Sequence, residues 1–287
     1  MIMCAQKIAI ATDSTAYLPP ALLERYGIFV MPLNLVWGEE VLKDGVDIRP
    51  TDFYRRLETA KVMPTTSQPS AGEFVDFFRQ VAEQAGTDTI VAAFISAALS
   101  GTVASAEAAR GMLSDLHIEI EDSRSTSMGL GFQVIAAAEV TQNGGTVKEA
   151  VEAMRRVRYS LNVMFVVDTL EFLHRGGRIG GGKRFLGTAL QIKPLLQLED
   201  GRIEPLEQVR TKKKALARLL EIASERKGGA RVPRAALVHA NAPEDCQALM
   251  DEVNALLLPD DIFMTEVSPV IGTHTGPGTL GLGFYTA

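Results

Sequence analysis

Hydroxyl side chains gather in four short segments of this sequence, at residues 13–15, 65–70, 96–102 and 122–127. Helix capping explains any one of these segments, because Ser and Thr are preferred at the starts of helices, and Ser70 with Glu73 matches the capping box. Together the four favour an anion site, since free N–H groups and the helix dipole attract negative charge. Gly101 leaves room for a ligand oxygen beside the backbone, and the few nearby cations suit one carboxylate better than a nucleotide triphosphate.

The first half of the chain alternates between strand and helix patterns, which predicts a parallel sheet covered on both faces. In such a sheet, ligands lie beyond the carboxyl ends of the strands, and three of the hydroxyl-rich segments follow predicted strands. The fourth, residues 65–70, precedes a helix that carries Phe74, Phe77 and Phe78 on one face. We expect strands at residues 7–12, 28–36, 89–95 and 117–121, and helices at 18–26, 52–59, 73–84, 102–113, 129–141 and 147–156.

The second half of the chain differs, and we expect an α/β unit with a mixed or antiparallel sheet. Asp200-Gly201 between two strand-like segments indicates a hairpin. Glycines at residues 176–182 predict a loop, and the chain closes on a glycine-rich stretch, residues 272–283. We expect strands at residues 162–168, 192–198, 203–209, 235–239 and 262–267, and helices at 212–226 and 244–257. The change of pattern predicts an N-terminal α/β domain, residues 1–160, and a C-terminal α/β domain, residues 161–287.

Length, charge and composition exclude several classes of protein. A chain of 287 residues exceeds one typical domain, and a net charge of −6 argues against nucleic acid as a main partner. No apolar run reaches the ~18 residues of a membrane-spanning helix. Cys4 and Cys246 lack metal-like or disulfide-like spacing, so we expect structural thiols and a cytoplasmic protein. His117, His174 and His239 show no ligand spacing, and we expect no metal.

Three motifs resemble catalytic or nucleotide-binding signatures without satisfying them. The segment at residues 177–183 matches GxxxxGK, but Arg184 stands where a phosphate-binding loop needs Ser or Thr. The GxGxxG match at residues 276–281 leaves too few residues for the helix that must follow. A Ser-His-Asp triad would draw on Asp13, Ser100 and His274, but no GxSxG elbow is present. His274 lies beside two hydroxyls and a rigid turn, so structural and functional roles both remain open.

The order of the segments resembles that of the DegV family over nearly the whole chain. The most specific stretches are TSQPS at residues 66–70, LSGT at residues 99–102 and HTGPG at residues 274–278. Asp13-Ser14-Thr15, residues 122–124 and residues 176–179 occur in the same order. This family includes the fatty-acid-binding subunit of bacterial fatty acid kinase.

The resemblance implies a two-domain carrier that binds a long-chain fatty acid, such as palmitate or oleate, at the domain interface. It implies that Ser and Thr hydroxyls hold the carboxylate, with His274 and Thr275 completing the polar end. A separate ATP-binding kinase subunit would phosphorylate that carboxylate for phospholipid synthesis, so the carrier itself needs no catalytic residue and no cofactor. The lipid-binding residues expected from the resemblance are Thr66, Ser100, Ser96, His274 and Thr275, and the expected contacts to the partner are Arg175 and Arg178.

Two further functions remain open from the sequence. A stand-alone hydrolase or transferase would use the same Ser and His cluster, and a lipid-sensing interaction protein would use bound lipid to control docking. Ala97 stands where many DegV members carry a second serine, which leaves the number of hydroxyls around the carboxylate undetermined. Phe74, Phe77, Phe78, Met164 and Phe165 are the candidates for lining the acyl tail.

Overall fold

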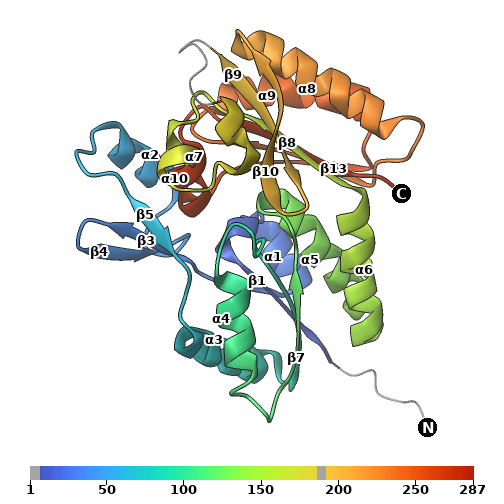
Figure 1. Cartoon of the computed structure of the whole chain (residues 1–287). Coiled ribbons are helices and arrows are strands. Elements are labelled where there is room, and N and C mark those ends of the chain that lie inside the picture. The colour runs from blue at the N-terminus through green and yellow to red at the C-terminus, as the bar shows by residue number, and fades with distance from the viewer. Residues whose placement is uncertain (1–6, 186–191) are drawn as a thin grey trace.

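A computed structural model describes residues 7–185 and 192–287, so Cys4 lies outside the described residues. Two sheets form the body of the protein, with helices around and between them (Figure 1). The strands are β1 (Ala9–Asp13), β2 (Ile28–Met31), β3 (Asn34–Trp37), β4 (Glu40–Lys43), β5 (Thr65–Ser67), β6 (Thr89–Phe94), β7 (His117–Asp122), β8 (Leu161–Val166), β9 (Lys193–Glu199), β10 (Arg202–Val209), β11 (Arg234–His239), β12 (Asp261–Glu266) and β13 (Leu280–Tyr285). The α-helices are α1 (Pro20–Tyr26), α2 (Pro50–Glu58), α3 (Ala71–Ala85), α4 (Thr102–Arg110), α5 (Ser127–Gln142), α6 (Val147–Ser160), α7 (Glu171–Arg175), α8 (Lys212–Lys227), α9 (Pro243–Leu257) and α10 (Pro269–Thr275).

The first sheet has the order β2-β1-β6-β7, and every pair in it is parallel, as the alternating pattern predicts. Side chains alternate between its faces. Ala9 and Ala11 pack with Phe74 and Phe78 of α3, whereas Ile10 packs with α5 and α6 on the other side. The three phenylalanines of α3 therefore belong to the core of this sheet.

A small antiparallel sheet, β4-β3-β5, extends from the first sheet and was not predicted from the sequence. The predicted β-rich stretch at residues 28–36 divides into β2 and β3. The strand β5 has three residues, too few for a period of two to be visible. Its central residue, Thr66, pairs with Leu35 of β3, and this pairing fixes the position of the TSQPS segment.

The second sheet is mixed, with the order β10-β9-β8-β13-β11-β12. The predicted hairpin is confirmed, because β9 and β10 pair in antiparallel register around Asp200-Gly201. The sequence predicted no element for the closing glycine-rich stretch, residues 272–283. That stretch contains α10 and then β13, which lies buried between β8 and β11. Likewise, the predicted glycine loop includes a 3-10 helix, Gly180–Phe185.

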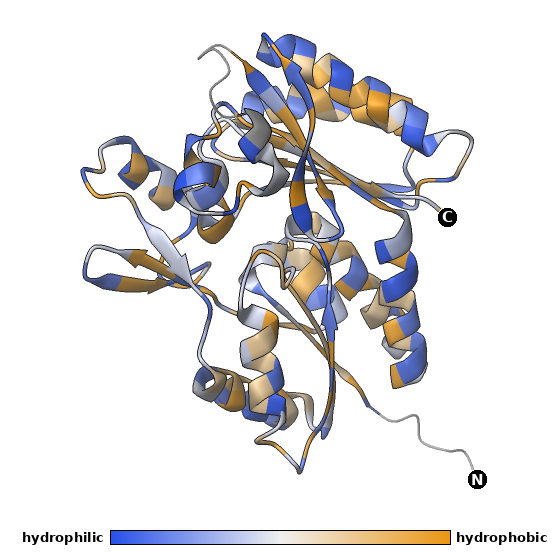
Figure 2. Cartoon of the chain, viewed as in Figure 1, coloured by the Kyte–Doolittle hydropathy of each residue, from blue (hydrophilic) through white to orange (hydrophobic). Residues whose placement is uncertain are grey.

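Helix α5 lies between the two sheets and packs with residues of both. Residues 128–135 are all buried, so protein surrounds this part of the helix on every side. By contrast, α6 and α8 carry hydrophilic and hydrophobic stripes in Figure 2, as expected of helices with one side facing solvent. Helices α8 and α9 cover the other face of the second sheet. That sheet begins at Leu161, directly after α6, but the division into two domains at this point stays a prediction.

Candidate functional site

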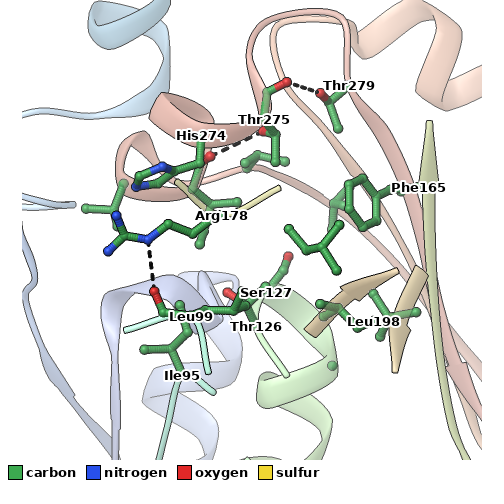
Figure 3. Close-up of a pocket in the computed structure, with 18 of the residues that line it drawn as sticks. Ile95, Leu99, Thr126, Ser127, Phe165, Arg178, Leu198, His274, Thr275 and Thr279 are labelled. Atoms are coloured by element: carbon green, nitrogen blue, oxygen red, sulfur yellow. Dashed lines mark hydrogen bonds between the residues drawn. The ribbon is translucent and has the colours of Figure 1, made fainter. Parts of the chain in front are cut away.

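A largely apolar cavity lies between the inner face of the second sheet and the loops at the end of the first (Figure 3). It contains about 1000 Å³ of space that protein atoms do not occupy, including its opening to solvent. Both halves of the chain line it. The apolar wall is formed by Leu33, Ile95, Leu99, Met128, Val163, Phe165, Leu173, Leu198, Ile203, Val238, Val267, Val270 and Ile271.

The cavity's depth depends on glycine in β13. Leu280 and Phe284 point toward α8 and α9, so the alternating residues Gly281 and Gly283 face the cavity. A side chain at Gly281 would meet Val238, because an added Cβ would lie 2.8 Å from Val238 Cγ2. Glycine at these positions thus leaves space that a β-branched residue of an ordinary central strand would fill.

Two predicted residues, Thr66 and His274, meet at the polar end of the cavity. Thr66 Oγ1 lies 2.8 Å from His274 Nε2, although 208 residues separate them in the chain. Strand β5 carries the threonine, and the last turn of α10 carries the histidine. Their hydrogen bond gives the otherwise apolar cavity a hydroxyl group held in one orientation.

The packing around His274 decides which ring nitrogen carries the proton. Its Nδ1 atom is buried without a hydrogen-bond partner and lies against Gly176. An added Cβ on Gly176 would lie 2.0 Å from Nδ1, and the glycine hydrogen that points the same way fills the space a proton would need. We therefore assign the proton to Nε2, which donates to Thr66 Oγ1. The Thr66 hydroxyl hydrogen is then free to point toward a ligand.

This assignment bears on the hydrolase alternative. A general base must present an unprotonated nitrogen to the hydroxyl that it activates. With its proton on Nε2, His274 donates to Thr66 and does not activate it. Ser100 Oγ lies 2.8 Å from Thr102 Oγ1, and the carboxylate of Asp13 accepts from Thr15 and from Ile95 N. Asp13, Ser100 and His274 therefore form hydrogen bonds with other groups and not with one another, so they do not form the triad considered from the sequence.

Burial, and to a smaller extent the nearby positive charge of Arg178, together lower the pKa of His274 to about 4. The imidazole is therefore neutral at neutral pH. Arg178 Nε donates to Leu99 O at 3.1 Å, and its Nη1 donates to Gly176 O at 2.7 Å. These bonds hold a guanidinium group at the polar end, where its charge favours an anionic ligand (Figure 3).

The lowered pKa predicts a loss of stability in acid that depends on His274. The unfolded chain binds a proton at the ordinary pKa of 6.5, whereas the folded chain binds it near 4, so stability falls as the pH drops through that window. We expect wild type to lose ~1–3 kcal/mol more than His274→Gln between the ends of the window. Urea unfolding at both pH values measures this difference, and equal losses would contradict it. Asp13 and Asp44, whose pKa values burial raises to about 6 and about 7, act in the opposite direction in both proteins, so their effect cancels.

The remaining predicted lipid-binding residues differ in where the structure places them. Ser100 and Thr275 line the cavity, and the Thr275 hydroxyl donates to Ile271 O at 3.2 Å. Ser96 is buried outside the cavity wall, and its hydroxyl donates to Gly201 O in the β9–β10 hairpin at 2.8 Å. Ala97 is exposed and is not part of the wall either. A serine at that position would therefore not line this cavity.

Comparison with known proteins identifies the family. The sequence profile of the DegV family, described as that of an uncharacterised protein, matches residues 7–287. The chain belongs to the DegV family. A DegV domain-containing protein from Streptomyces coelicolor is 45% identical over 281 residues, which cover 97% of this chain and 98% of that protein.

Solved structures agree with the architecture of this DegV protein. A DegV family protein from Thermus thermophilus, described for its fatty acid binding, is 36% identical with a TM-score of 0.92 and covers 98% of this chain and 100% of its own. DegV from Bacillus subtilis, described as a fatty acid binding protein, is 32% identical with a TM-score of 0.90 and the same coverage. The predicted fold class, a parallel N-terminal sheet and a mixed C-terminal sheet, is confirmed.

The two arginines expected to contact a partner lie in different surroundings in this DegV protein. Arg175 is exposed and pairs with Glu171 within α7. Arg178, three residues later, lines the cavity, so its guanidinium faces the ligand space rather than the open surface. Of the tail candidates, Phe165 lines the cavity, whereas Met164 packs into the core under α8 and α9.

Sequence reasoning missed two groups of cavity residues. Thr126 and Ser127 belong to the fourth hydroxyl-rich segment but were not singled out within it. Gly281 and Gly283 were noticed only as part of a glycine-rich stretch, although glycine at every second residue is a signal for one small-residue face of a strand.

Within residues 7–185 and 192–287, no cluster of three or more metal-ligating side chains occurs. Across the same ranges, no helix has the length and apolarity needed to cross a bilayer.

Proposed function

We propose that this DegV protein binds a long-chain fatty acid, with the carboxylate at the polar end and the tail in the apolar cavity. The observation that carries the proposal is the Thr66–His274 pair beside Arg178 at one end of a largely apolar space. A carboxylate removed from water needs several donors, and Thr66, Ser100 and Arg178 supply them. The tail contributes about 0.8 kcal/mol per buried methylene.

We propose further that the protein is a carrier subunit, which presents the bound acid to a separate ATP-dependent kinase in the cytoplasm. In that reaction a carboxylate oxygen attacks the γ-phosphorus of ATP, the bond to ADP breaks, and an acyl phosphate forms for phospholipid synthesis. The resemblance to the fatty acid kinase subunit supports this role. It is also supported by hydroxyl donors that leave one carboxylate oxygen accessible. Arg175 is our candidate contact to the kinase, because it is exposed and charged.

Mass spectrometry of protein purified from a bacterial host without delipidation tests the binding. We expect a long-chain fatty acid, such as palmitate or oleate, at about one molecule per chain, because the proposed site has one polar end for a carboxylate. Absence of lipid, together with no uptake of added palmitate, would contradict the proposal. A buffer blank carried through the same purification and extraction controls for contaminating lipid.

A kinase assay then separates the carrier from the other two functions. We expect acyl phosphate, trapped as the hydroxamate with hydroxylamine, when the lipid-loaded protein is mixed with ATP and an ATP-binding fatty acid kinase subunit. A lipid sensor would bind the acid but yield no acyl phosphate. A hydrolase would turn over esters without a partner and would lose that activity in Ser100→Ala.

A further inference from the structure

A second group of polar side chains, Thr126 and Ser127, lies part-way along the cavity. Figure 3 shows them between the polar end, with His274 and Arg178, and the apolar wall at Phe165 and Leu198. The hydroxyl oxygens of both residues are buried, and neither has a hydrogen-bond partner. Among the described residues that line the cavity, these are the two buried hydroxyls without one.

Helix capping does not account for these hydroxyls. Thr126 occupies the N-cap position of α5, yet its side chain makes no hydrogen bond to the helix. Thr146, at the same position of α6, does cap its helix, because its hydroxyl accepts from Glu149 N at 3.3 Å. The backbone of Ser127 has a positive φ of 51°, a conformation that costs energy for a residue other than glycine. The hydrogen-bonding capacity of the hydroxyls at residues 126 and 127 is therefore unused in the free protein.

An unsubstituted alkyl tail cannot satisfy these groups. A hydroxyl that is buried without a partner in the free protein gains a hydrogen bond when it pairs with a ligand oxygen, and one such bond corresponds to a factor of about ten in affinity. A ligand oxygen at this place would pair with both hydroxyls. It would also meet the amino end of the 16-residue helix α5, where the helix dipole favours an oxygen acceptor.

We propose that the cavity selects long-chain acids that carry a hydroxyl group part-way along the chain, bound by Thr126 and Ser127. The proposal rests on the proposed function, since it places the carboxylate at Thr66 and His274 and the methyl end beyond Phe165. The substituent hydroxyl donates to one of the two side chains and accepts from the other. Selectivity arises because the ligand hydroxyl gives both side chains a partner, whereas stearate leaves them as they are in the free protein.

Competition binding with delipidated protein tests the proposal. The probes are stearate and a panel of monohydroxystearates with the hydroxyl at different carbons, measured on wild type and on Thr126→Val/Ser127→Ala. We expect wild type to bind at least one monohydroxystearate about tenfold or more tightly than stearate. The double variant should lose that preference and bind stearate about as tightly as wild type does. Valine replaces threonine with nearly equal shape, so the cavity keeps its volume.

A conservative variant guards against a change of fold. Thr126→Ser keeps the hydroxyl and should retain the preference, with thermal unfolding measured for every variant. Equal affinities for stearate and every monohydroxystearate in wild type would overturn the proposal but leave the proposed function intact. Failure of wild type to bind either probe would overturn both. A preference that persists in the double variant would assign it to other residues and would also overturn the proposal.

Discussion

Thr66→Val is expected to weaken fatty acid binding by about 10- to 100-fold, the range expected for losing one hydrogen bond to a carboxylate. Thr66 is the residue whose hydroxyl hydrogen His274 leaves free, because the protonated Nε2 occupies the oxygen's acceptor side. Valine has the shape of threonine but cannot donate. The variant also leaves His274 Nε2 without its acceptor inside the protein, which adds to the loss. Displacement of a fluorescent fatty acid from delipidated protein measures the change.

The neighbouring residue Thr65 provides a matched control for this substitution. It lies on the same short strand, points to the opposite side, is exposed and does not line the cavity. Thr65→Val should therefore bind palmitate as wild type does and unfold at a similar temperature. If Thr66→Val binds as tightly as Thr65→Val, the carboxylate does not bind at this residue.

Gly176→Ala is expected to reduce fatty acid affinity by about tenfold or more, although residue 176 lies outside the cavity wall. Its φ of −74° is accessible to any residue, so the backbone does not require glycine there. The requirement comes from His274, since an alanine Cβ would lie 2.0 Å from Nδ1 and must displace the ring. Movement of the ring breaks the bond to Thr66 and frees the hydroxyl to rotate. The same displacement assay measures the loss.

A double-mutant cycle distinguishes this mechanism from general damage. In a His274→Ala background, Gly176→Ala should have little further effect on affinity, because the ring that it displaces is gone. Gly72→Ala is the control, since its Cβ would meet Ser70 Oγ at an ordinary 3.9 Å within α3. That variant should bind normally and be as stable as wild type or slightly more so. Additive losses in the cycle would show that residue 176 acts independently of the histidine.

The longer elements of this fold follow from local sequence patterns. Helix α3 has its phenylalanines at helical spacing and begins with the Ser70–Glu73 capping box, so both its type and its start were predictable. The turn at Asp200-Gly201 was predictable because the local backbone preference of Asp-Gly determines it. By contrast, β13 depends on its neighbours. Its glycines have little preference for a strand, and pairing with β8 and β11 on both sides supplies the stabilisation.

The candidate site divides in the same way. Sequence alone determined which segments carry hydroxyls and that they lie near the ends of strands and the starts of helices. It could not determine where each side chain points, because neighbouring positions in a turn direct their side chains to different sides. Ser96 therefore reaches Gly201 while Ser100 reaches the cavity, and Arg178 turns inward while Arg175 stays exposed.

Tertiary structure alone decided which groups meet. Thr66 and His274 are brought together by the packing of α10 against β5, and no local preference encodes a contact across 208 residues. The tautomer of His274 depends on Gly176 from a third segment. Whether a hydroxyl is free for a ligand, as at Thr126 and Ser127, or already used, as at Ser96, depends on every neighbour within hydrogen-bonding distance. Such neighbours come from distant parts of the chain, so the folded structure alone reveals them.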